Sequence, residues 1–233
     1  MRPIQVETLH AEDGTTTRRP LLEGEIDDLK LASVVVSPSS TVRPELFRER
    51  ARALLFLDGT GGISDTRHIH IDGLGFYCPL HDHPFEITAE NEGLTYLELL
   101  VTLREDERSV LARNAEGFYP RFVSYWDSPT YRESFKSEKT VSRTLLPHDR
   151  FPRLCIGSVE VDGPDAVGTH VHPMLEQIFV GLRDNSCIVT ADGQETSLGA
   201  LEALHIPLGS THGARVEAGQ KLHYVWIAVV VGS

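Results

Sequence analysis

The chain has 233 residues, of which 22 are Lys or Arg and 34 are Asp or Glu, so its net charge at neutral pH is −12. This acidic balance argues against a nucleic-acid partner and against an anionic membrane surface, because both require clustered basic side chains. A hydrophobic share of 40% excludes a disordered chain and is enough to build a sizeable core.

Targeting and redox signals indicate a cytoplasmic protein. The longest apolar run, from Tyr224 to Val231, is too short to span a bilayer. The N-terminal stretch MRPIQVETLHAEDG has no apolar signal-peptide core. The three cysteines are widely spaced and form neither a disulfide framework nor a CxxC metal motif.

In chain order, residues 1–20 are mostly polar and predict a loose arm. Short runs rich in β-branched and aromatic residues follow, separated by turns such as DGTGG (58–62) and ADG (191–193). Only Pro44–Ala53 has a pattern that predicts one or two turns of helix. The polar segment Asp127–Arg153 carries three prolines and lacks a period of two, so we expect it to connect two β units. The predicted strands are Leu31–Val36, Ala53–Leu57, His68–Ile71, Gly75–Cys78, Leu94–Leu103, Arg121–Trp126, Leu154–Val161, Gln177–Leu182, Cys187–Thr190, Leu201–Ile206 and Lys221–Val231.

The two β units resemble each other in their sequence rhythm. Residues 54–80 and 179–208 each contain an apolar strand, a Gly/Asp turn, a second strand, another turn and an apolar run that ends in Pro-Leu. A long apolar strand follows each of them. This internal duplication predicts an all-β chain with an N-terminal unit at 1–126, a linker at 127–153 and a C-terminal unit at 154–233.

The sharpest functional signal is the run His170-Val-His172-Pro-Met-Leu-Glu176. Residues two apart on a strand point to the same face, so His170 and His172 can converge, and Glu176 has the same parity. The later run Pro207-Leu-Gly209-Ser-Thr-His212 places a Pro–Gly turn before a third histidine. Chance would produce both motifs in this order in roughly one shuffled sequence in a thousand. Three imidazoles and one carboxylate suit one divalent transition metal, namely Fe, Mn, Ni, Co or Zn.

These two motifs resemble those of the cupin superfamily. The first cupin motif is a Gly-rich HxHxxxE stretch, here 168–181, and the second is a PxGxxH stretch, here 207–212. The resemblance covers about residues 154–231 and implies a small jelly-roll (double-stranded β-helix) barrel. It also implies that His170, His172, Glu176 and His212 are the metal ligands. Two departures, at 199–202 and at Arg183, concern turns and not ligands.

The N-terminal unit looks like a cupin that has lost its first motif, so the resemblance implies a bicupin with a degenerate N-terminal unit. Aligned with the C-terminal unit, it has Glu45, Phe47 and Ala51 at the positions of the first three ligands, and Phe and Ala cannot bind a metal. The run from His81 to Glu86, which includes His83, leaves two alternatives open. It is either a second metal or substrate site or a histidine-rich loop without a ligand role.

An apolar pocket is expected around the C-terminal site. Its predicted walls are Leu175, Ile178, Val180, Leu204, Ile206, Val225 and Ile227, with Tyr224 and Trp226 as an alternative face of the closing strand. The motif strands contain no Lys for Schiff-base chemistry. His205 is either a hydrogen-bond donor beside the ligands or a buried strand histidine, and His148 lies in a polar loop with no expected role.

The sequence therefore predicts a metal-dependent enzyme that acts on a small organic acid or enol, with dioxygenase chemistry as the most specific expectation. The alternatives are a metal-dependent isomerase or lyase, and a non-catalytic cupin that binds a sugar or a small metabolite, because the fold does not select among them. The expected partner is a small molecule. Apolar closing strands in both halves leave a homodimer open.

Overall fold

The computed structural model describes residues 4–9, 15–115 and 117–231, which form two compact units. Unit 1 contains the described residues of 1–9, 128–148 and 153–233, and unit 2 contains those of 10–127 and 149–152. The segment 127–153, for which a linker was expected, is therefore divided between the units and contains two strands of unit 1. Of the expected N-terminal arm, residues 1–3 and 10–14 lie outside the described residues.

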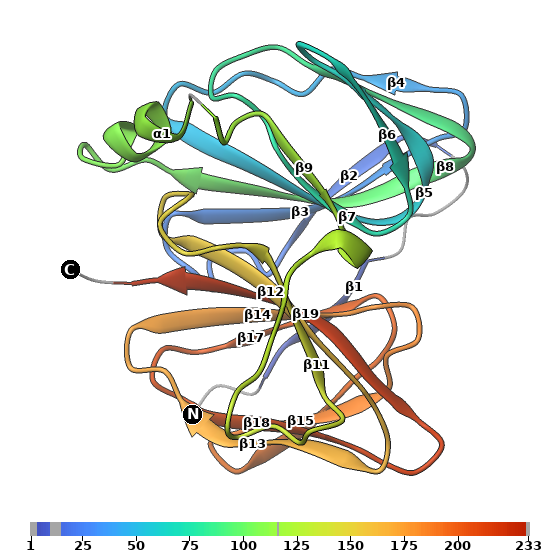
Figure 1. Ribbon diagram of the computed structural model, residues 1–233, viewed down its shortest axis with the longest axis vertical. Helices are drawn as coiled ribbons and strands as arrows, with labels where there is room; N and C mark the ends of the chain where they lie inside the picture. Colours follow the sequence, from blue (N-terminus) through green and yellow to red (C-terminus); the bar gives the residue numbers. More distant parts are fainter. Residues whose placement is uncertain (1–3, 10–14, 116, 232–233) are drawn as a thin grey trace. The chain divides into compact units, whose positions relative to one another are not determined.

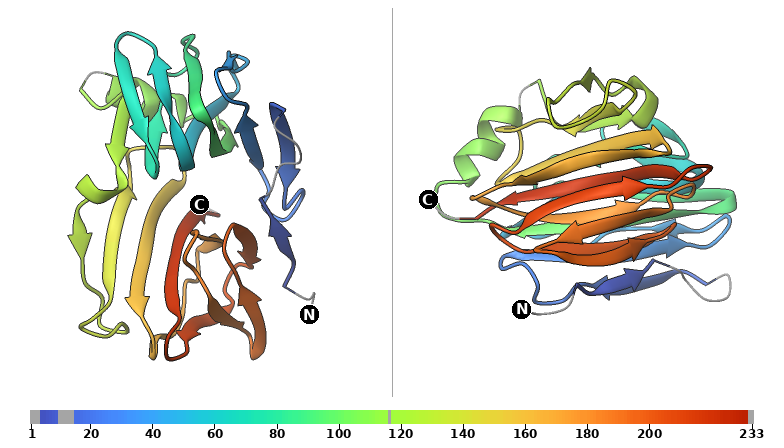
Figure 2. Two further views of the ribbon diagram at one scale, coloured as in Figure 1. Left: turned by 90° about the vertical axis from the view of Figure 1, so that its right-hand side faces the viewer. Right: turned by 90° about the horizontal axis from the view of Figure 1, so that it is seen from below.

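Unit 1 consists of two antiparallel sheets, which form two layers in Figure 1. The seven-stranded sheet has the order β1-β17-β14-β19-β12-β11-β10, and the part from β10 to β19 is clear in the left view of Figure 2. The four-stranded sheet has the order β13-β18-β15-β16. The strands are β1 (Val6–Thr8), β10 (Thr130–Tyr131), β11 (Val141–Leu146), β12 (Leu154–Asp162), β13 (Asp165–Val171), β14 (Leu175–Gly181), β15 (Cys187–Ala191), β16 (Gln194–Leu198), β17 (Glu202–Ile206), β18 (Thr211–Val216) and β19 (Lys221–Val230).

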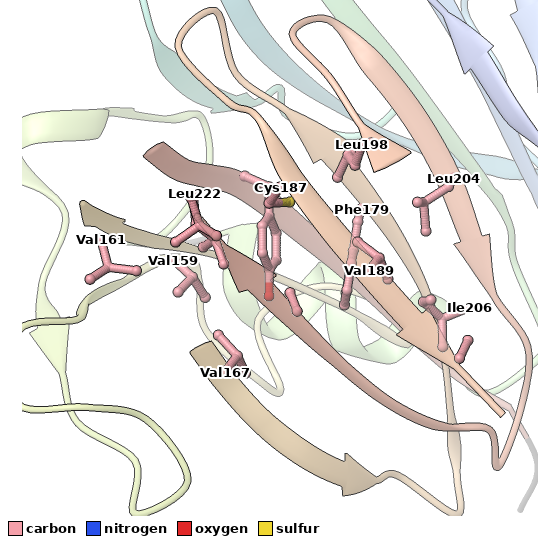
Figure 3. Close-up of a cluster of buried hydrophobic side chains, with 14 residues drawn as sticks. Val159, Val161, Val167, Phe179, Cys187, Val189, Leu198, Leu204, Ile206 and Leu222 are labelled. Atoms are coloured by element: carbon pink, nitrogen blue, oxygen red, sulfur yellow. The ribbon is translucent and has the colours of Figure 1, made fainter. Parts of the chain in front are cut away.

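The core of unit 1 lies between these two sheets. Both sheets present alternate apolar residues to it, as expected for strands with one buried face (Figure 3). Each large apolar side chain that is fully buried stabilises the fold by about 1.5–3 kcal/mol. The buried members are Val159, Val161, Val167, Phe179, Cys187, Val189, Ala191, Leu198, Leu204, Ile206, Ala214, Val216, Leu222 and Tyr224.

Of the arm expected at residues 1–20, residues 4–9 belong to unit 1, and residues 17–20 are part of strand β2 (Thr17–Leu21) in unit 2. Strand β1 pairs with β17, with Val6 opposite Leu204, and the amide of Leu9 donates a hydrogen bond of 2.8 Å to the carbonyl of Leu201. The Leu9 side chain is buried. Local sequence patterns do not reveal this pairing, because β1 and β17 are almost 200 residues apart in the chain.

Unit 2 is built on two long strands, β5 and β8, which pair along most of their length and are bent by register shifts near Phe56–Gly61. Its sheet has the order β2-β3-β8-β5-β7-β9, with β4 on β8 and β6 on β5. The elements are β2 (Thr17–Leu21), β3 (Leu29–Val36), β4 (Thr41–Val42), β5 (Arg50–Ser64), β6 (His68–Asp72), β7 (Gly75–Cys78), β8 (Glu86–Thr102), α1 (Arg108–Ala115), β9 (Arg121–Ser124) and the 3-10 helix Tyr125–Asp127.

The one α-helix in the described part of the chain is α1, and the helix expected at Pro44–Ala53 does not form. Residues 50–53 are instead the start of β5, where Arg50 lies opposite Thr102 of β8. Within the described residues, no helix has the length and apolar character that a membrane span requires.

Candidate metal centre

Three histidines of unit 1 converge at one end of the space between the sheets. The ligand atoms of His170, His172 and His212 lie within 4.8 Å of one another. Their ring centroids are 4.5 Å (His170 to His212), 4.9 Å (His170 to His172) and 5.5 Å (His172 to His212) apart. This spacing lets one small cation contact all three imidazoles.

Strand pairing and a turn before β18 place the rings of His170 and His212. His170 of β13 lies directly opposite His212 of β18, next to a register shift that begins at Val167. The chain enters β18 through a turn in which the Ser210 amide donates to the Pro207 carbonyl. Gly209 has a φ of +71° in this turn, a conformation that a residue with a side chain adopts only under strain. The Pro–Gly spacing of the sequence therefore does direct His212 inward.

A hydrogen bond to the backbone fixes the orientation of two of the rings. Nδ1 of His170 is 2.8 Å from the Gly168 carbonyl, and Nδ1 of His212 is 2.9 Å from the Ser210 carbonyl. A carbonyl oxygen only accepts, so Nδ1 carries the proton in each ring. Nε2 of each neutral ring is then left with a free electron pair, which is the state that binds a metal.

The cluster favours neutral imidazoles. Burial lowers the pKa of His212 to about 4; its hydrogen bond to Ser210 opposes this effect, and the adjacent His170 and His172 add to it. Burial and the neighbouring His170 also lower the pKa of His172. His172 and His212 are therefore neutral imidazoles at neutral pH and offer lone pairs, not charges.

The fourth expected ligand, Glu176, does not join this cluster. Its carboxylate lies 3.0 Å from Nε2 of His205, which is itself buried. The parity argument fails because β13 ends at Val171 and β14 starts at Leu175, so the intervening turn resets the alternation. The odd-numbered residues of β14 face the histidines, and Glu176 faces the other side of the sheet. His205 is thus a buried strand histidine paired with a carboxylate.

Gln177 occupies the inward position that Glu176 was expected to fill. It lines the same cavity as the three histidines and is 6% exposed. Its Oε1 and the Nε2 of His212 are buried atoms that have no hydrogen-bond partner among the described residues. A buried polar atom without a partner costs about 1–3 kcal/mol, so both atoms fit a ligand that would satisfy them. Gln177 was not among the expected ligands, because the HxHxxxE motif places a carboxylate at position 176.

The cavity around the cluster has a volume of about 290 Å³ and lies within unit 1. Its walls are largely aromatic and aliphatic. Phe135 stacks on His170 with ring centroids 4.2 Å apart, and Phe179 stacks on Tyr224 at 4.6 Å. The amide of Gly168 donates 2.8 Å to the Phe135 carbonyl, and a side chain at Gly168 would collide with that carbonyl, so glycine is needed for this close approach.

The walls differ in part from those expected. Leu175, Tyr224 and Trp226 line the cavity, whereas Ile178, Val180, Val225 and Ile227 lie on the opposite face of β14 and β19. Leu204 and Ile206 belong to the adjoining core. The alternation along β19 had two possible phases, and the phase with Tyr224 and Trp226 facing inward is the observed one.

A charged pair, Glu133 and Lys136, lines the cavity from the segment before β11, outside the motif strands, which contain no Lys. The Lys136 side chain is 6% exposed and forms an ion pair with Glu133 and a 3.0 Å hydrogen bond to Oγ of Ser142. Burial lowers the pKa of Lys136, and the ion pair with Glu133 opposes this shift. His148 also lines the cavity. The motif strands could not reveal these three residues, because Glu133, Lys136 and His148 all lie in the segment 127–153 that was expected to be a linker.

The second histidine run of the sequence does not form a comparable cluster. His81 contacts the Arg48 carbonyl at 3.2 Å, and Glu86 pairs with Arg43 at 2.6 Å. Within the described residues, the ligand atoms of His81, His83 and Glu86 are not brought together as those of unit 1 are.

Comparison with known proteins gives a fold and no sequence family. No protein-family model and no curated protein matches the chain. A cupin 2 conserved barrel domain protein from Leptotrichia buccalis is similar over 97% of this chain and 96% of its own, with a TM-score of 0.65 and 13% identity. An oxalate decarboxylase from Lactobacillus farciminis, solved as a formate complex, covers 99% and 87% with a TM-score of 0.73 and 12% identity. A protein of Pseudomonas aeruginosa named for induction by glyoxylate covers 99% and 90% with a TM-score of 0.79 and 8% identity. The chain therefore has the mainly β fold of cupin proteins.

Proposed function

We propose that unit 1 holds one divalent transition metal and uses it to act on a small organic acid or enol. The observation that carries this proposal is the convergence of three imidazoles and the unpartnered Gln177 amide oxygen on one cavity that also contains a buried ammonium group. We further propose that both units are cupin-type barrels, and that unit 2 has lost the metal site.

The residues present fit a metal. His170, His172 and His212 would bind through Nε2 or the corresponding free nitrogen, and Gln177 would bind through Oε1. This set of nitrogen and neutral oxygen donors suits Mn, Fe, Co, Ni or Zn. When bound, such an ion supplies Lewis-acid or redox chemistry to an oxygen atom of the substrate.

Lys136 is the group best placed to orient an acidic substrate. Its ammonium group is held by Glu133 and Ser142 beside the histidine cluster, so it can donate a hydrogen bond to a substrate carboxylate without first losing side-chain freedom. Glu133 is the carboxylate of the same cavity that can accept a proton from the substrate. The aromatic wall of Phe135, Phe179 and Tyr224 limits the access of water to the bound anion.

The comparisons support this substrate class at the level of the fold. One protein of similar fold is an oxalate decarboxylase crystallised with formate, so a small carboxylate is compatible with the architecture. Oxidative cleavage of an enol or hydroxy acid is the most specific reaction that we propose for this chain.

Turnover by metal-loaded protein tests the proposal. Oxygen uptake and product formation would be measured with the Fe- and Mn-loaded chain on a panel of enols, diketones and hydroxy acids, with His212→Ala as the blank. Lys136→Met should raise KM for acidic substrates by about tenfold or more, because a charged hydrogen bond is worth about 1.5–3 kcal/mol. The matched control is Lys139→Met, which removes an exposed lysine outside the cavity.

Two outcomes would redirect the proposal. Turnover that persists without oxygen would replace oxidative cleavage by isomerase or lyase chemistry. Saturable binding of an acid without any turnover would favour a non-catalytic binding protein.

A further inference from the structure

The inward face of the unit 2 sheet changes from apolar to charged along its strands. Val34, Leu54 and Tyr96 belong to the unit 2 core. At the same parity on the same three strands stand Arg52 on β5 and Glu98 on β8, which are buried, and Lys30 on β3, which is exposed. Core-facing strand positions are normally apolar. Charged residues at such positions reduce apolar packing and indicate a functional role.

These charged residues line a cavity of about 690 Å³, the walls of which belong to unit 2. Cations outnumber carboxylates on its walls, although the chain as a whole carries a charge of −12. The apolar part of the wall includes Phe47, Tyr96 and Leu100. The charged residues that line it are Arg18, Lys30, Arg43, Arg50 and Arg52 together with Glu45 and Glu98.

The inner charges of this cavity are paired and fixed. Nε of Arg52 is 2.8 Å from Glu98, and both side chains are 7% exposed. Glu98 also accepts a hydrogen bond of 2.8 Å from Nε of Arg18, and Nη2 of Arg52 donates to the Glu45 carbonyl at 2.6 Å. This network is a rigid floor in which the single carboxylate of Glu98 offsets one of the two guanidinium charges.

Two further cations line the cavity, where the carboxylate outside the network is that of Glu45. Among the described residues, Lys30 and Arg50 form no ion pair; the Arg50 guanidinium lies 5.1 Å from the centre of the Phe47 ring. Lys30 lies opposite Leu100, and Arg50 lies opposite Thr102, so the two cations stand on the two strands that flank β8. A cavity with unpaired cations on both sides of an apolar wall suits a molecule with anionic groups and a short carbon skeleton.

We propose that unit 2 binds a small organic dianion in this cavity, with its negative charges held by Lys30 and Arg50. The site is separate from the metal centre of unit 1 and does not depend on it. Dicarboxylates and phosphate monoesters share this chemistry, and the experiment distinguishes them.

Calorimetric titration of the full-length, metal-free chain with succinate and with glycerol 3-phosphate tests the proposal. At least one probe should bind saturably. Lys30→Gln/Arg50→Gln should weaken that binding by about a hundredfold or more, because each of the two charged hydrogen bonds that it removes is worth about tenfold in affinity. Each single variant should weaken it by an intermediate factor, and thermal unfolding of each variant establishes that it is folded. His170→Ala/His172→Ala should bind the probe as the unmodified chain does.

The matched control is Arg19→Gln/Lys139→Gln, which removes the same charge from exposed positions outside the cavity. Equal weakening in this control would show a general charge effect and overturn the proposal. Failure of both probes to bind at millimolar concentration would also overturn it. Loss of binding in the histidine variant would assign the anion to unit 1 instead.

Discussion

Gln177 and Glu176 are adjacent in sequence, yet they face opposite sides of β14, and this decides which of them can reach a metal ion. Glu176 is paired with His205, whereas Oε1 of Gln177 is buried beside the three histidines without a hydrogen-bond partner. Gln177→Leu should therefore weaken metal binding by at least about tenfold. Competition of Zn or Mn with a fluorescent chelator measures the change.

Glu176→Gln is the matched control for that experiment, because it removes a charge from the neighbouring position and can keep the contact with His205. It should leave the metal affinity nearly unchanged. The reverse order, with Glu176→Gln more damaging than Gln177→Leu, would restore the carboxylate as the ligand.

Burial of His212 makes the metal-free protein sensitive to mild acid. The pKa of His212 falls from its ordinary value of 6.5 to about 4 in the folded chain, so the unfolded chain binds more protons between these pH values. Stability contributed by the neutral ring is present above pH 6.5 and is lost as the pH falls to 4, by about 3 kcal/mol in total. Urea unfolding in the presence of a chelator, at a series of pH values, measures this loss.

His212→Leu is the variant that isolates this effect. Its stability should fall less steeply between pH 6.5 and 4 than that of the unmodified chain, because it has no ring to protonate. Parallel pH profiles of the two proteins would contradict the assignment to His212.

At the level of single residues, the sequence was informative where a short spacing alone sets the geometry. The HxH spacing and the Pro–Gly turn bring His170, His172 and His212 together. Glu176 was assigned across a turn, where strand parity no longer holds, so the sequence pattern could not place it. Lys136 could not be found either, because its position depends on which strand the preceding segment joins.

Among the elements, β1 is the least expected, and its contribution to the stability of the fold can be measured. Leu9 directly follows β1, is 1% exposed and belongs to unit 1 through the pairing of β1 with β17. Leu9→Ala should destabilise the chain by about 2–4 kcal/mol, which is typical when a buried leucine is truncated. Urea unfolding gives this value. A change below about 0.5 kcal/mol, as for exposed surface positions, would mean that β1 does not stay on the sheet in solution.

The local sequence pattern predicted a helix at Pro44–Ala53, and this prediction is wrong. The segment Pro44–Ala53 has helical spacing, but pairing of Arg50 with Thr102 draws its end into β5. Helix α1 was overlooked because its start is not a Ser or Thr cap. Glu107, the residue directly before α1, instead accepts a 2.8 Å hydrogen bond from the Arg104 amide, three residues earlier.

At the scale of the whole molecule, the chain divides into discontinuous units, and this has a consequence for fragments. Strand β11 pairs with β12, and Phe135 stacks on His170, so the segment 128–148 supplies both a strand and a cavity wall. A fragment of residues 128–233 should therefore resist urea better than one of residues 154–233, and only the longer one should bind metal with measurable affinity. Equal stability and metal affinity of the two fragments would make 127–153 a linker after all.

The all-β class was visible in the sequence because turns and β-rich runs alternate along the whole chain. Which segments make up each unit was not visible in the sequence. The pairing of β1 with β17 and of β11 with β12 is set by the three-dimensional fold and not by a local pattern. The cupin fold, in contrast, could be inferred from two short motifs, and the structural comparisons agree with it.

The central claim is that unit 1 holds one divalent metal ion on the histidine cluster, and metal analysis tests it most directly. The purified full-length chain would be loaded with Mn, Fe or Zn, dialysed, and analysed for metal content beside His170→Ala/His172→Ala. We expect about one ion per chain in the unmodified protein and almost none in the variant, because the variant removes two of the three converging imidazoles. Undiminished metal in the variant would contradict the account and place the ion elsewhere in the chain.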